Sequence, residues 1–164
     1  MILRDKGKTF TPAPEGLHQA VCVDFVDLGV MDTPWGEKAQ CEVRWQIDEV
    51  LPTSGARFLV VKRYTASLNE KATLRHHLES WRGRKFTAEE LKGFDTEQLV
   101  GVNCMVQIMH VQGTKNPEAT FAVVQAVVPM VKGMTKLVPE DYVRVKDRPA
   151  ESPNGTPDES DVPF

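Results

Sequence analysis

The chain has 164 residues, of which 41% are hydrophobic and 26% are charged, so it can build one hydrophobic core of ordinary size. No apolar run approaches the roughly 20 residues that cross a bilayer, and the charged N-terminus lacks the apolar stretch of a secretory signal. The sequence therefore predicts no membrane-spanning helix, and we expect a cytoplasmic protein.

The net charge of −3 is spread unevenly along the sequence. From Glu15 to Glu49 there are eight acids and two bases, whereas from Arg57 to Lys85 there are eight bases and two acids. Residues 149–164 contain acids and no Lys or Arg. A nearly neutral body can therefore present one positive surface, although folding can also average this asymmetry away.

Three cysteines, Cys22, Cys41 and Cys104, lie far apart in apolar stretches. An odd number at such spacings predicts buried free thiols rather than a disulfide framework. No CxxC occurs, and His76-His77 has no cysteine or carboxylate at a metal-ligand spacing. We therefore expect neither a metal site nor a cofactor.

Five strands are predicted from alternating or β-branched stretches, and in chain order they cover residues 16–28, 40–50, 57–65, 102–111 and 120–128. The second is the clearest, because Cys41, Val43, Trp45 and Ile47 alternate with polar residues. Loops are expected at residues 29–38, 51–55 and 112–118, where Pro, Gly, Asp and Asn gather. After the last strand, only residues 138–145 are expected to pack.

Between the third and fourth strands the hydrophobic period changes to that of a helix. Leu74, Leu78 and Trp81 share one face of a helix predicted over residues 69–82. Ser67 or Asn69 is expected to cap its start, and Gly83 follows its end. Residues 87–90 then form a capping-box pattern that opens a short helical turn.

This order predicts a mainly β fold: a five-stranded Greek-key OB-fold barrel with one helix between strands three and four. The helix would plug one end of the barrel, with Trp81 in the core. An SH3-like barrel and a small α+β sheet are the alternatives. We expect this domain to cover residues 1–148 and a disordered acidic tail to cover residues 149–164, whose composition cannot build a core.

OB-folds bind oligonucleotides on a sheet face flanked by loops, with cations near the phosphates and aromatic rings beneath the bases. The residues that could supply this chemistry are Trp35, Arg44, Lys62, Arg63, Tyr64 and Lys115. Trp35 is the strongest stacking candidate, because a Pro-Trp-Gly loop cannot easily bury its own indole; packing against the barrel is the alternative. Tyr64 shares its face with Lys62, as at the rim of a groove, whereas Trp45 is expected in the core.

The sequence ends in a pattern that combines acids with an aromatic residue: Asp158, Glu159, Asp161, Val162, Pro163 and Phe164. This pattern resembles the C-terminal tip of bacterial single-stranded DNA-binding proteins, an acidic run closing with Ile-Pro-Phe or Leu-Pro-Phe. The resemblance implies that the tip recruits replication or repair proteins. A partner would need an apolar pocket for the Phe ring beside an Arg or Lys side chain for the terminal carboxylate.

The body resembles the OB-fold single-stranded DNA-binding proteins of tailed bacteriophages, in the stretches 9–16, 33–38, 43–49 and 71–87. That resemblance implies sequence-independent binding of single-stranded DNA during phage replication, recombination or repair, in the bacterial host cytoplasm. It implies no catalytic role, and the scattered His residues and missing phosphate-loop and nucleophile motifs also favour a non-catalytic protein. The alternative is an adaptor whose OB-like barrel diverts host proteins without binding DNA. Self-association stays open.

Overall fold

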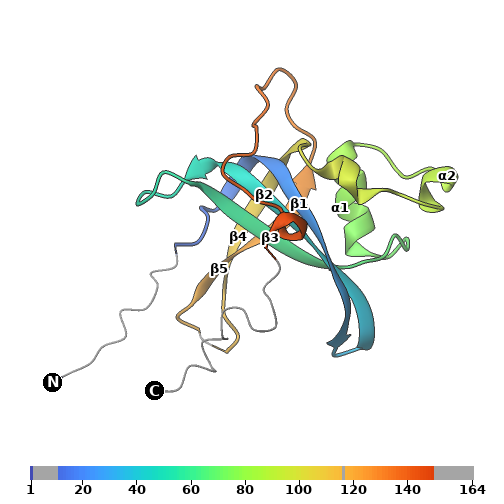
Figure 1. Cartoon of the computed structure of the whole chain (residues 1–164), viewed down its shortest axis with the longest axis horizontal. Helices are drawn as coiled ribbons and strands as arrows, with labels where there is room; N and C mark the ends of the chain where they lie inside the picture. The colour runs from blue at the N-terminus through green and yellow to red at the C-terminus, as the bar shows by residue number, and fades with distance from the viewer. Residues whose placement is uncertain (2–10, 116, 150–164) are drawn as a thin grey trace.

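The computed structural model describes Met1, residues 11–115 and residues 117–149 of the chain. It is mainly β, with five strands in one antiparallel sheet (Figure 1). The strands are β1 (Gly16–Thr33), β2 (Gly36–Val50), β3 (Arg57–Thr65), β4 (Asn103–Gln112) and β5 (Thr120–Val128). Between β3 and β4 lie the helix α1 (Thr73–Arg82), the short α2 (Ala88–Leu91) and the 3₁₀ turn η1 (Thr96–Leu99); a second 3₁₀ turn, η2 (Val145–Asp147), follows β5.

The strands are ordered β3-β2-β1-β4-β5 across the sheet. The long strand β1 makes this order, because it pairs with β4 over Gly16–Val21 and with β2 over Ala20–Thr33. The predicted five strands and the helix between the third and fourth are therefore confirmed. The predicted closure is not: β3 and β5 approach each other, but no hydrogen-bonded ladder joins them in the described residues.

The helix covers one end of the curved sheet, as predicted. Leu74, Leu78 and Trp81 are buried, and the Trp81 ring lies 6.0 Å from that of Trp45, centroid to centroid. The Trp81 Nε1–H donates to the backbone oxygen of Asn103 at 3.1 Å, so the buried indole leaves no unpaired donor. All three cysteines are buried free thiols, as expected.

The start of α1 differs from the prediction. Its N-cap is Ala72, which offers no side-chain hydrogen bond. Ser67 and Asn69 instead accept from the backbone N–H groups two residues on, at 3.0 Å each, and shape the turns before the helix. The end is as predicted, because Gly83 takes the left-handed conformation with φ 74°. The capping box at Thr87 and Glu90 is also confirmed.

The loop predicted over residues 29–38 is wrong. Here β1 and β2 continue as a two-stranded arm, with Val30 opposite Ala39 and Asp32 opposite Glu37. The reversal needs only Pro34 and Trp35, because Gly36 supplies a positive φ of 102°. An arm that leaves both faces in solvent needs no hydrophobic alternation, so its strands carry no sequence pattern.

Residues 130–148, which we call the strap, cross the outer face of the sheet in front of β1 and β2 (Figure 1). Asn103 on β4, Val21 on β1 and Gln46 on β2 form one row across three strands. Asn103 exchanges two hydrogen bonds with the backbone of Leu137, at 2.7 and 2.9 Å, and Gln46 exchanges two with that of Glu140, at 2.6 and 2.8 Å. Three extended residues cover about 10 Å, which is also about two strand spacings, so the strap runs across the strands.

Polar groups hold the strap, contrary to the prediction that only residues 138–145 pack. Val138 and Val143 lie 69% and 57% exposed, so these two apolar side chains of the predicted segment point away from the sheet. Packing also begins earlier, because Gln19 donates to the backbone oxygen of Thr135 at 2.6 Å.

Candidate nucleic-acid interface

Trp35 lies at the tip of the β1–β2 arm and is 84% exposed. The turn is fixed by Thr33, whose hydroxyl accepts from the Trp35 N–H at 3.2 Å and donates to the Gly36 oxygen at 2.6 Å. The ring therefore projects from an ordered backbone without packing against the sheet. Of the two readings of this residue, burial against the barrel is wrong, and the ring is available for stacking.

The β4–β5 hairpin carries a second exposed ring that the sequence did not single out. Phe121 is 47% exposed and lies opposite Val111. Met109 and Leu17, both exposed, are on the same outer face of the sheet. The sequence carries no clear signal, because all residues from Phe121 to Val128 except Gln125 are apolar and the buried face of this strand could not be assigned. In the structure Val124 is buried and Phe121 points to the opposite face.

Lys115 lies exposed in the loop that joins β4 to β5, as predicted. Its ammonium makes no ion pair with any residue that the structure describes. A free cation and an exposed ring thus belong to one hairpin, while Trp35 belongs to the other. Figure 1 shows both hairpins extending beyond the body of the sheet.

The outer face of β2 and β3 brings two of the predicted cations together. Glu42 accepts from Arg44 at 2.9 Å and from Arg63 at 3.4 Å. Burial alone would lower the pKa of Arg44, but its hydrogen bonds to Glu42 and Tyr142 raise that pKa, and the guanidinium stays charged. One carboxylate therefore pairs with two guanidinium groups, and the cluster of Glu42, Arg44 and Arg63 keeps a net charge of +1.

Tyr64 does not lie on the face that binding would use. It is only 4% exposed, and its hydroxyl is 2.7 Å from His77 Nδ1. Burial raises the pKa of Tyr64 and lowers that of His77, so both groups stay neutral near pH 7. The expectation that Tyr64 stands at an exposed rim is wrong, because its face of β3 closes over α1.

Lys62 shares that inner face with Tyr64, and its ammonium lies 5.5 Å from the Tyr64 ring centroid. The neighbouring Arg63 points to the opposite side of the sheet, where it meets Glu42. The run of Lys62, Arg63 and Tyr64 is therefore divided between two faces by the alternation of the strand, and it makes no single patch.

The strap removes part of the polar sheet face from solvent. Asp24 is 1% exposed and accepts from Tyr142 Oη at 2.8 Å, Arg144 Nε at 3.1 Å and the Val145 N–H at 2.9 Å. Burial alone would raise the pKa of Asp24, but these three donors outweigh it and lower the pKa below its usual range. The face open to a ligand is thus reduced to the outer parts of β2, β3, β4 and β5.

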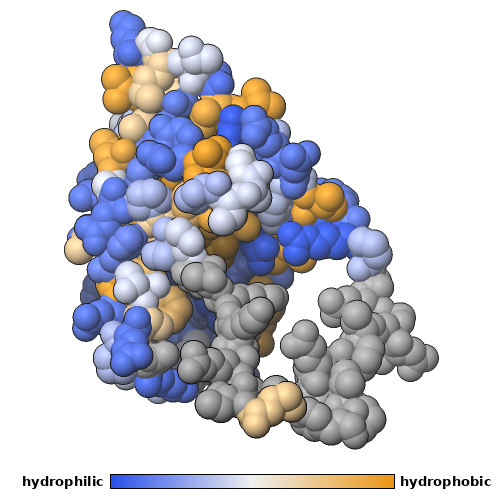
Figure 2. Space-filling model, turned by 90° about the vertical axis from the view of Figure 1, so that its left-hand side faces the viewer, coloured by the Kyte–Doolittle hydropathy of each residue, from blue (hydrophilic) through white to orange (hydrophobic). Residues whose placement is uncertain are grey.

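Seen from the side that carries the β2–β3 turn, the surface mixes hydrophilic and hydrophobic residues in small groups (Figure 2). The six tip residues, Asp158, Glu159, Asp161, Val162, Pro163 and Phe164, lie outside the described residues. The predicted tail, apart from Pro149, also lies outside them, so the domain boundary stays a prediction.

Within the described ranges, no group of His, Cys, Asp and Glu side chains could hold a metal ion. No helix in that part of the chain is long and apolar enough to cross a membrane. No protein-family model matches the chain, and no curated protein matches it.

Proposed function

We propose that this protein binds single-stranded DNA without strong sequence preference. The observation that carries the proposal is the pair of hairpins that extend from the sheet, each with an exposed aromatic ring: Trp35 on one and Phe121 on the other. Exposed rings are sequence-tolerant platforms, because every base has a face that can stack on them. Lys115 supplies an exposed cation on the same hairpin as the second ring, where it could meet the phosphates.

The arrangement of the strands supports the same proposal. An OB-fold is a five-stranded, partly open Greek-key barrel, which binds oligonucleotides on strands two and three and on the loops after strands one and four. The order β3-β2-β1-β4-β5, with a helix between β3 and β4, is the order such a barrel requires. We therefore propose that this sheet is an OB-fold barrel whose β3 and β5 edges meet without a complete ladder.

Recruitment of partners completes the proposal. The acidic residues 158–161 and the Val162-Pro163-Phe164 sequence would engage replication or repair proteins of the bacterial host or of a phage. The protein would then act as a non-catalytic coat and adaptor on exposed strands in the host cytoplasm.

One observation favours the second candidate, an adaptor that does not bind DNA. Glu42 already occupies Arg44 and Arg63, and the strap covers Gln46. The sheet face between the hairpins is therefore less positive and less open than the sequence suggests.

Binding to oligo-dT, followed by tryptophan fluorescence and anisotropy, tests the proposal. Trp35→Ala and Phe121→Ala should each weaken binding by roughly 1–3 kcal/mol. Val30→Ala is the matched control, because Val30 is 68% exposed on the same arm as Trp35 but carries no ring. Lys115→Ala should lower the salt slope by about one contact instead.

The outcomes separate the two candidates. Salt-sensitive binding that prefers single-stranded over double-stranded oligonucleotides, and that weakens with either ring removed, supports DNA binding. If the parent shows no salt-sensitive binding to oligo-dT, the adaptor replaces it. If it binds and all four variants bind equally, the hairpins are not the site.

A further inference from the structure

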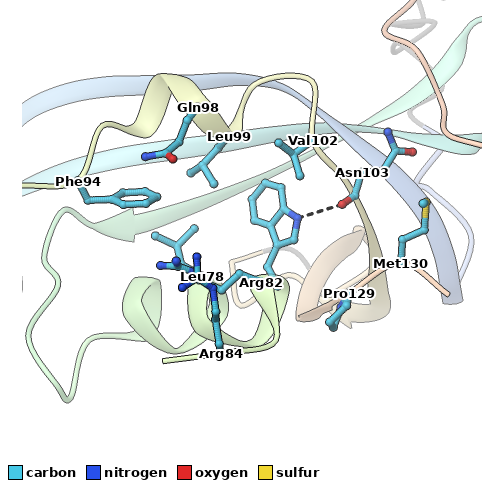
Figure 3. Close-up of a pocket in the computed structure, with 11 residues that line it drawn as sticks. Leu78, Arg82, Arg84, Phe94, Gln98, Leu99, Val102, Asn103, Pro129 and Met130 are labelled. Carbon is cyan, nitrogen blue, oxygen red and sulfur yellow. Dashed lines mark hydrogen bonds between the residues drawn. The ribbon is translucent and has the colours of Figure 1, made fainter. Parts of the chain in front are cut away.

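A pocket of about 270 Å³ lies between α1 and the segment that leads from η1 into β4 (Figure 3). A cavity of roughly 150 Å³ accepts benzene, so the space suffices for one aromatic side chain. Its apolar lining residues are Leu78, Trp81, Phe94, Leu99, Val102, Pro129 and Met130. Val102 stands at the opening, since it is 42% exposed.

Two guanidinium groups, those of Arg82 and Arg84, line the same pocket (Figure 3). The Arg82 Nη2 donates to Glu90 at 2.6 Å, and its guanidinium carbon lies 4.9 Å from the Phe86 ring centroid. The Nη1 nitrogen of Arg82 is buried and has no hydrogen-bond partner among the residues that the structure describes. This nitrogen has almost no exposed surface, so a ligand in the pocket reaches it only when the guanidinium turns. A buried cationic donor without an acceptor is costly, which favours such a turn toward an acceptor in the pocket.

Arg84 adds a second positive charge that is not neutralised. It is exposed, and its side chain forms no ion pair or hydrogen bond with any residue that the structure describes. The adjacent Lys85 is likewise exposed and unpaired there. Because Glu90 compensates Arg82, the lining keeps the positive charge of Arg84 next to an apolar floor, and Lys85 adds a second charge one residue further along the chain.

The lining favours an apolar side chain over a nucleobase as occupant. A base needs free hydrogen-bonding groups for its edge. The Trp81 Nε1–H already donates to the backbone oxygen of Asn103. Apart from the two arginines, the remaining polar side chains of the lining are Gln98 and Asn103. The Asn103 amide is itself hydrogen-bonded to the backbone of Leu137. The Phe94 ring packs edge-on against Phe86, at 5.0 Å between centroids.

We propose that this pocket is a docking site for an acidic peptide segment of a partner protein that carries a bulky apolar side chain beside its carboxylates. The apolar side chain enters between Leu99 and Trp81, and a carboxylate accepts from the exposed Arg84 and, once the Arg82 guanidinium turns toward the pocket, from its Nη1. The site lies on the helix side of the sheet and does not depend on the two hairpins.

Anisotropy of a fluorescein-labelled peptide, acetyl-Asp-Glu-Asp-Phe-amide, tests the site on the full chain. Burying the ring should make the parent bind it roughly tenfold or more tightly than the matching peptide with Ala in place of Phe. Arg84→Glu and Val102→Glu should each weaken binding roughly tenfold or more, because both place a like charge at the opening. Lys38→Glu is the matched control, since Lys38 is exposed on the β1–β2 arm and unpaired there.

Oligo-dT affinity, measured on the same preparations, keeps this test separate from that of DNA binding. The expected result is loss of peptide binding in Arg84→Glu and Val102→Glu, with peptide binding retained in Lys38→Glu and oligo-dT affinity kept in Arg84→Glu. Equal binding of the Phe and Ala peptides by the parent would overturn the proposal, as would unchanged peptide binding by Arg84→Glu. Displacement of the peptide by oligo-dT would also overturn it, because the pocket would then read nucleic acid.

Discussion

Replacing Asp24 with Asn tests how the strap is held. The carboxylate accepts from Tyr142, Arg144 and Val145, while it is 1% exposed. An amide of the same shape turns an NH₂ toward one of these donors, and its uncharged oxygen accepts from the others, so the Tyr142 and Val145 bonds become neutral and the Arg144 bond loses the carboxylate charge. A hydrogen bond to a charged group contributes roughly 1.5–3 kcal/mol and a neutral one roughly 1 kcal/mol. After allowing for the relief of a buried charge, we expect Asp24→Asn to lower the free energy of unfolding by about 2–4 kcal/mol.

Urea unfolding followed by tryptophan fluorescence measures this change, and hydrogen exchange of residues 135–147 locates it. The matched control is Asp27→Asn on the same strand, because Asp27 is exposed and, among the described residues, accepts only from the Gly29 N–H at the irregularity in β1. We expect the control to cost less than about 0.5 kcal/mol. If both variants unfold at the same urea concentration and exchange alike, Asp24 does not anchor the strap.

Three further predictions concern pH and the end of the chain. Folding lowers the pKa of Asp24, so the contribution of its carboxylate to stability is complete above its unfolded pKa of about 3.9 and is lost as the pH falls through the folded pKa. In acid, hydrogen exchange of the strap should therefore increase in the parent but not in Asp24→Asn. Truncation after Arg148 keeps the whole strap, and circular dichroism should show a folded sheet that binds oligo-dT at least as tightly, since four acids are removed; loss of folding would place the boundary elsewhere. Removing Phe164 should abolish capture of replication or repair proteins in a pull-down from bacterial lysate, with oligo-dT affinity nearly unchanged; recovery of the same proteins would contradict a role for the tip.

The strands and the helix could be predicted where one side faces the core. Cys41, Val43, Trp45 and Ile47 alternate because one face of β2 is buried, and all four are at most 1% exposed. The β1–β2 arm could not be predicted, since neither of its faces is buried. The strap was missed for a related reason: side-chain amides of Gln46 and Asn103 bind backbone groups, which every residue of the strap possesses.

Among the candidate site residues, exposure in loops was predictable and the direction of strand residues was only partly so. Trp35 and Lys115 lie in tight connections that cannot bury them. The side chain of Tyr64 is apolar except for its hydroxyl, so it can be buried when that hydroxyl finds a hydrogen-bond partner, as it does in His77. The sequence of β3 alone does not show that partner. The orphaned nitrogen of Arg82 depends on residues from α1 and α2 together, so no pattern within one segment indicates it.

The strap also sets an order for the folding of the chain. Its anchors join Asp24 to residues 118 to 121 positions later, so they form only after β2, β3, β4 and β5 have been synthesised. During synthesis the five strands leave the ribosome before the strap does, because the strap follows them in sequence. Val21 is fully buried in the folded protein, between the strap-binding side chains of Asn103 and Gln46. Until the strap covers it, its apolar side chain is therefore exposed to solvent. The nascent sheet is consequently most vulnerable to aggregation in the interval before the strap covers it.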